Sequence, residues 1–168
     1  MKNLMKVTLA LAIMGTATGA PLHAQDRDPG GSRIVVQSQT AFAERVGHEL
    51  NNQLFRIRYP GDHAGVVRVY FTANGHGTAE DIRVIESSGM SWVDRAALRA
   101  VGNMDRLGQA PGGPSSGQPV LATIVFARSE SELRRLSRDL DEGLDAILAS
   151  GELDPRVLAL TLAAPARS

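Results

Sequence analysis

The chain has 168 residues, and its 18 basic and 18 acidic side chains balance to a formal net charge of zero. A nucleic-acid-binding protein usually carries a basic excess, so this function is not indicated. The chain has no cysteine, which excludes disulfides, thiolate chemistry and cysteine-based metal sites. Its length suffices for one domain with a substantial core.

Residues 1–24 are predicted to be an export signal. Lys2 and Lys6 precede a short apolar run over residues 7–14, and Leu22-His23-Ala24 is a plausible cleavage site. The run is shorter than the roughly 20 residues that span a bilayer, but a retained anchor is the alternative. Cleavage leaves 16 arginines, no lysine and 18 acidic residues.

Residues 25–37 are predicted to form a flexible leader, because they contain Pro29-Gly30-Gly31. The apolar residues 34–36 are read as a short strand or an apolar anchor. A helix is predicted from Thr40 until Tyr59-Pro60-Gly61 ends it. Four apolar residues at four-residue spacing give this helix a stripe: Phe42, Val46, Leu50 and Leu54.

Two strands joined by a turn follow. Val66–Thr72 alternates between apolar and polar residues, Asn74-Gly75 is a hairpin signal, and Gly77 indicates a loop longer than two residues. Residues 82–87 return as the second strand. Arg68 and Tyr70 fall on the opposite face from the apolar residues, which makes them weak candidates for partner contacts on an exposed face.

The next segment reads as a strand end, a tight turn and a helix. Gly89 supplies the freedom of a sharp turn, and Ser91 is placed to cap the helix with Asp94 as capping-box partner. The helix extends to about Met104. Trp92 is either a core residue or an interface anchor, and the core position is favoured. The apolar face comprises Val93, Ala97, Ala100, Val101 and Met104.

The rest of the chain supplies a third strand and a helical extension. Residues 108–117 are a glycine-rich loop, and residues 120–126 alternate as a strand. A long amphipathic helix is predicted over residues 129–150, and a short one after Asp154-Pro155. The long helix carries Leu133, Leu136, Leu140, Leu144, Ile147 and Leu148 on its stripe. The predicted fold is α+β: a three-stranded antiparallel sheet packed by two helices, with an extra C-terminal helical extension.

A family resemblance covers residues 38–127. The Asn74-Gly75 turn, Ser87-Ser88-Gly89 and the sequence Asp94-x-Ala96-Ala97-Leu98 closely resemble the C-terminal domain of TonB-family proteins. The helix before the first strand is closer in layout to the related domain of TolA. The motif residues are structural in this reading: Asn74, Gly75, Ser87, Ser88, Gly89, Asp94, Ala97 and Leu98. The resemblance implies a non-catalytic periplasmic module of a Gram-negative bacterium, with residues 128–168 as an added amphipathic extension.

The resemblance also implies a binding mode. An edge strand would receive an extended peptide or protein segment by β-augmentation. That strand is uncharged and comprises Val120, Leu121, Ala122, Thr123, Ile124, Val125 and Phe126. The partner could be an outer-membrane TonB-dependent transporter, a second copy of the chain, or the chain's own extension acting as a gate. The role could lie in transport or in envelope integrity.

Three other functions stay open: a self-associating structural domain, a truncated membrane-anchored energy transducer and, less favoured, a small periplasmic hydrolase using Ser87 or Ser88. No cofactor is expected. His48-Glu49 lacks the second histidine of a zinc-protease motif, so no metal site is expected either. His63 and His76 are expected to be surface residues.

Overall fold

The computed structural model describes residues 30–57, 64–111, 117–138 and 140–164, and side chains are not described for residues 30–38, 141 and 142. The predicted export signal and His63 lie outside these ranges. The elements run α1 (Gly30–Arg56), β1 (Gly65–Ala73), β2 (Ala79–Glu86), α2 (Ser91–Gly102), β3 (Gln118–Phe126), α3 (Glu130–Arg138), α4 (Leu140–Ala149) and β4 (Leu158–Ala163). None of the helices in the described ranges has the length and apolarity needed to span a membrane.

The strands form one mixed sheet in the order β2-β1-β3-β4. β1 pairs antiparallel with both β2 and β3, whereas β4 pairs parallel with β3. The α+β class is confirmed. The sheet has a fourth strand, however, because residues 158–163 form β4 and not the predicted short helix.

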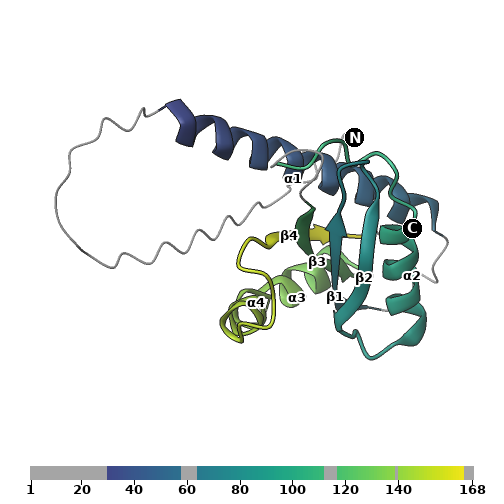
Figure 1. Cartoon of the computed structure of the whole chain (residues 1–168). Coiled ribbons are helices and arrows are strands. Elements are labelled where there is room, and N and C mark those ends of the chain that lie inside the picture. The colour runs from purple at the N-terminus through teal and green to yellow at the C-terminus, as the bar shows by residue number, and fades with distance from the viewer. Residues whose placement is uncertain (1–29, 58–63, 112–116, 139, 165–168) are drawn as a thin grey trace.

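One face of the sheet is covered by α1 and α2, and Figure 1 shows α1 crossing the top of the sheet with α2 beside β2. Alternation along β1 turns Val67, Val69 and Phe71 toward these helices, and all three are fully buried. The predicted stripe of α1 is buried in the same core. Packing of two amphipathic helices on one sheet face therefore builds the main core.

The opposite face lies toward α3 and α4, which form the start of the C-terminal extension (Figure 1). Arg68 and Tyr70 are buried on this face. The expectation that they line an exposed face is therefore wrong, although their placement opposite the core residues is right. We name residues 128–164, comprising α3, α4 and β4, the C-terminal arm.

The start of the first helix differs from the prediction. α1 begins at Gly30, so residues 30–37 of the predicted flexible leader are helical. The residues read as a strand or an anchor, 34–36, lie within this helix. The helix predicted over residues 129–150 is described as α3 and α4 on either side of residue 139, which lies outside the described residues.

Candidate partner-binding site

The predicted partner-binding strand lies inside the sheet. β3 has β1 on one side and β4 on the other, so the expectation that residues 120–126 form a sheet edge is wrong in this structure. All seven residues of the predicted site are buried. The arm supplies a strand of its own to this position, and its backbone satisfies groups of β3 that an edge would leave unpaired. Binding of a partner segment there stays a prediction.

β4 lies along almost the whole predicted site. Their parallel register runs from Val120 opposite Leu158 to Val125 opposite Ala163. Beyond the strand, the Ala164 N–H donates to the Val125 carbonyl at 2.8 Å. Backbone groups alternate in direction along a strand, so the N–H groups of even-numbered β4 residues point toward β3. Those of odd-numbered residues point toward the outer edge.

Apolar side chains hold β4 on the α1 side. Leu158, Leu160 and Leu162 are 6–7% exposed and belong to the main core. Leu162 packs close to α1, since a Cβ at Gly47 would lie 3.7 Å from its Cδ2. Gln118 Nε2 also donates to the Arg156 carbonyl at 2.8 Å, which ties the approach to β4 to the start of β3.

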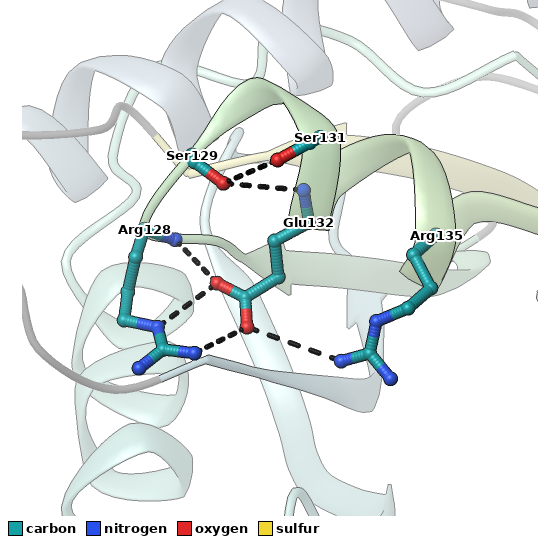
Figure 2. Close-up of polar contacts among 5 residues, drawn as sticks. All are labelled: Arg128, Ser129, Ser131, Glu132 and Arg135. Atoms are coloured by element: carbon teal, nitrogen blue, oxygen red, sulfur yellow. Dashed lines mark hydrogen bonds and ion pairs between the residues drawn. The ribbon is translucent and has the colours of Figure 1, made fainter.

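The first turn of α3 fixes how the arm leaves β3 (Figure 2). The Glu132 N–H donates to Ser129 Oγ at 3.2 Å, and the Glu132 carboxylate accepts the Arg128 N–H at 3.0 Å. This reciprocal arrangement is close to a capping box. The Arg128 guanidinium also grips the carboxylate, with Nη2 2.8 Å from Oε1. Hydrogen bonds from Arg128 hold the pKa of Glu132 at about 2.

A second turn directs the chain into β4. Asp154 Oδ1 accepts the Arg156 N–H at 2.8 Å, and Arg156 Nη2 lies 2.7 Å from Asp154 Oδ2. The side-chain hydrogen bond from Arg156 is the main cause that lowers the pKa of Asp154 to about 2. The Asp-Pro sequence that predicted a helix start therefore forms a turn before a strand.

A buried arginine connects the sheet to the arm. Arg68 on β1 donates from Nη2 to the Leu140 carbonyl at 2.9 Å and forms an ion pair with Glu86 on β2. Its Nε is buried without a hydrogen-bond partner among the described residues. A Cβ at Gly143 would lie 2.7 Å from the guanidinium, so this glycine lets α4 approach closely. Sequence patterning placed Arg68 on the correct face but gave no sign of this contact.

The helices of the arm pack less tightly than β4. Among the described side chains of α3 and α4, Leu140 alone is buried, and the rest of the predicted stripe is half-buried. A cleft of about 420 Å³ separates α4 from β2, with Ile85, Ile147 and Leu153 among its lining residues. The arm is thus anchored mainly at Arg68 and along β4.

The Ser-Ser-Gly motif forms a hydrogen-bonded turn. The Asp94 carboxylate accepts three hydrogen bonds. The Ser87 hydroxyl donates one at 2.5 Å, and Ser88 donates two, from its backbone N–H at 2.9 Å and from its hydroxyl at 2.8 Å. Burial acts to raise the pKa of Asp94, but these hydrogen bonds outweigh it and lower the pKa. Gly89 takes a φ of +80°. These contacts agree with a structural role for the turn.

The predicted cap of α2 is wrong in one detail. α2 begins at Ser91, its N-cap is Met90, and no side chain caps it. Asp94 bonds the preceding turn and is not the capping-box partner of Ser91. Ala97 is fully buried, whereas Leu98 and Trp92 are partly buried against the core.

The hairpin loop follows the sequence signal. Asn74 Oδ1 accepts the N–H groups of His76 and Thr78, both at 3.0 Å, and the Asn74 N–H donates to the Thr78 carbonyl. Gly75 lies within this loop, which is longer than two residues as predicted. His48 and His76 are exposed. Within the described ranges, no three histidine or acidic residues gather as a metal site would require.

The strand, turn and helix order of this region has a counterpart among known families. Residues 61–127 match the family described as the Gram-negative bacterial TonB protein C-terminal. This part of the chain is a TonB-family C-terminal domain. The TonB-domain match includes β1, β2, α2 and β3, while α1 and the whole C-terminal arm lie outside it.

A solved structure also resembles the chain. The solution structure of the TonB C-terminal domain from Helicobacter pylori is 24% identical, and the match covers 68% of this chain and 99% of that one with a TM-score of 0.37. No curated protein matches the chain. The TonB family belongs to the Gram-negative cell envelope, and its C-terminal domain is a non-enzymatic module of protein interaction.

Proposed function

We propose that the chain is a periplasmic binding module that captures an extended segment of a partner protein by strand addition to β3. The partner segment would occupy the position that β4 holds in the structure. The observation that supports this most directly is the β3–β4 pairing, because six consecutive residues of an extended chain fit along the predicted site. An outer-membrane TonB-dependent transporter is the partner class that we favour.

The composition of β3 supports the same proposal. The strand carries no charged residue from Val120 to Phe126. Natural sheets commonly protect a permanent free edge with charges, proline or bulges, and β3 has none of these between residues 120 and 126. Backbone hydrogen bonds would give affinity, as in other β-augmentation complexes. β4 is then a competitor that the partner must displace, which makes the arm a gate.

Export is part of the proposal. Cleavage after Ala24 would release the mature chain into the periplasm, whereas a retained signal would anchor it in the inner membrane as a truncated transducer. Mass spectrometry of the periplasmic fraction decides between them, since a mature mass beginning at Gln25 supports export. Recovery of the chain only in the membrane fraction, with its signal intact, would contradict the proposed release into the periplasm.

Two proline variants test the binding mode. Leu160→Pro removes an N–H that points toward β3, so it weakens β4 and opens the edge. Thr161→Pro removes an N–H that points outward and leaves the β3 ladder intact, which makes it the matched control. Each variant and the unchanged chain are immobilised at low density and exposed to detergent-solubilised outer membrane, and captured transporters are quantified by mass spectrometry.

We expect Leu160→Pro to capture more transporter than either the unchanged chain or Thr161→Pro. Circular dichroism and thermal unfolding check that each variant is folded. If no transporter is recovered with any variant, or if Leu160→Pro captures less than the control, strand addition to β3 is wrong for this chain.

A further inference from the structure

The cleft between α4 and β2 has the size and the lining of a ligand site. Its volume of about 420 Å³ lies within the range of about 300–1,000 Å³ that is typical of small-molecule pockets. Ile85, Ile147 and Leu153 give it apolar walls, while Arg83 and Glu152 supply one charge of each sign. Apolar walls with a few polar groups are the usual composition of such a site.

The cleft opens because α4 meets the sheet closely only near its start. There, a Cβ at Gly143 would lie 2.7 Å from the Arg68 guanidinium, so the helix and β1 are in close contact. Toward the end of the helix, Ala146 and Ile147 line the cleft instead. A molecule bound in the cleft would therefore touch both the sheet and the C-terminal arm.

Arg83 is held in place, but no carboxylate of the described residues forms an ion pair with it. It lies opposite Tyr70 in the β1–β2 register, and its guanidinium carbon is 4.3 Å from the centre of the Tyr70 ring. Tyr70 is buried, which fixes the surface on which the guanidinium stacks. The N–H donors at the edge of the guanidinium are thus available to a carboxylate from outside the chain.

Glu152 lines the same cleft from the arm. The Ser150 hydroxyl donates to the Ile147 carbonyl at 2.7 Å and accepts the Glu152 N–H at 3.3 Å, and Gly151 takes a φ of 70°. This turn sets the position of Glu152 after the end of α4. Within the described ranges, the Glu152 carboxylate pairs with no basic side chain, so it is available to an ammonium group.

The arrangement of the two charges indicates the kind of ligand. Arg83 and Glu152 line one cleft without forming an ion pair with each other, so a ligand that satisfies both needs two separated charges with an apolar part between them. A free amino acid carries its ammonium and carboxylate on one carbon. The termini of an extended dipeptide lie about 7 Å apart, at 3.3–3.6 Å per residue. A short apolar peptide therefore fits the cleft better than a single amino acid.

We propose that the cleft binds a short apolar peptide with free termini. Its carboxylate would pair with Arg83, its ammonium with Glu152, and its side chains would pack on the apolar walls. The bound peptide joins β2 to α4 and so stabilises the docked arm. Since β4 belongs to the same arm, the peptide would also oppose displacement of β4 by a partner, a consequence that rests on the proposed function.

NMR titration of the purified full chain with four probes tests the site. We expect leucyl-leucine to shift the amide signals of the residues that line the cleft. N-acetyl-leucyl-leucine and leucyl-leucinamide should each bind at least tenfold more weakly, because each lacks one terminal charge. Glycyl-glycine should show no binding, because it has no apolar side chain to pack on the walls.

Two charge-removing variants assign the partners. Arg83→Gln should abolish the difference in affinity between leucyl-leucine and its amide, and Glu152→Gln the difference between leucyl-leucine and its acetylated form. Arg95→Gln is the matched control, because Arg95 is an exposed arginine on α2 that does not line the cleft. Added leucyl-leucine should also slow hydrogen exchange of the α4 amides in the unchanged chain and in this control.

The proposal is overturned if leucyl-leucine does not bind, if both capped forms bind as tightly, or if binding leaves exchange of the α4 amides unchanged. It is also overturned if, without peptide, Arg83→Gln and Glu152→Gln speed this exchange equally and the double variant adds nothing, since the two side chains then pair with each other. No partner protein is present, so the result is independent of transporter capture. Peptide binding without capture refutes strand addition to β3 alone, and capture without peptide binding refutes the cleft site alone.

Discussion

The ion pair between Arg68 and Glu86 predicts an unequal response to removal of its two partners. The Arg68 side chain is 3% exposed, whereas the Glu86 side chain is 49% exposed. Loss of Glu86 therefore leaves a buried positive charge, while loss of Arg68 leaves a carboxylate that water can solvate. The two substitutions break the same ion pair but leave different buried groups unpaired: the Arg68 guanidinium in one case and the Leu140 carbonyl in the other.

Glu86→Gln should lower the free energy of unfolding by about 3 kcal/mol, because it leaves the buried positive charge of Arg68 without its counter-charge. The remaining charge-assisted contact, from Arg68 to the Leu140 carbonyl, satisfies only part of the guanidinium. Arg68→Met should cost about 1–2 kcal/mol, because it leaves the Leu140 carbonyl unpaired but retains an apolar side chain of similar length.

Urea unfolding of both single variants and of the double variant provides the assay. The double variant should resemble Arg68→Met alone, since Glu86 has no buried charge to neutralise once the arginine is gone. In Glu86→Gln, the arm could detach locally from the sheet and expose Arg68 to water. The loss of stability would then be no larger than the free energy with which the arm docks on the sheet, and hydrogen exchange of the α4 amides detects such detachment. The reasoning is refuted if Arg68→Met is as costly as Glu86→Gln, or costlier.

Three further changes have defined outcomes. Asp94→Asn should lower the free energy of unfolding by about 1–2 kcal/mol in thermal unfolding, because the turn loses charge-assisted hydrogen bonds. In the unchanged chain, the lowered pKa of Asp94 contributes stability at pH values above its ordinary pKa of 3.8, and this stability is lost as pH falls through the folded-state pKa. Asp94→Asn should therefore reduce the loss of stability at acidic pH. Gly77→Ala should destabilise more than Gly151→Ala in urea unfolding, since both have positive φ but only at Gly77 would a Cβ meet a backbone atom, at 3.1 Å; equal costs would contradict this. Phe71→Ala should cost about 3–5 kcal/mol, measured by urea unfolding, and a loss below 1 kcal/mol would show that the site is not packed as described.

The central part of the fold was predictable because local pattern and tertiary packing agree there. The alternation of residues 66–72, the Asn74-Gly75 loop and the apolar face of α2 each specify one structure. Gly89 and Asp94 belong to a turn whose contacts span only a few residues. Contacts between residues this close along the chain can be predicted from a single sequence.

Burial of Arg68 could not be predicted in the same way. Its position in the alternation of β1 assigns it to a face but does not say what covers that face. The covering backbone comes from Leu140, far along the chain, through a carbonyl that carries no sequence signal. The half-open packing of α3 and α4 has the same origin, because an amphipathic stripe specifies that a helix docks and not how closely.

The arm's last strand shows how one signal can mask another. Asp154-Pro155 is typical of a helix start, which predicts a short helix that would carry Leu158, Leu160 and Leu162. Their spacing of two is, however, the period of a strand, and Leu-Ala-Leu-Thr-Leu-Ala fits that period throughout. In the structure, β3 supplies a parallel partner and α1 an apolar cover, so strand pairing prevails over the local helix signal. Two uncharged strands thus lie side by side at this end of the sheet, and the exposed backbone that sequence patterning assigned to β3 belongs to β4.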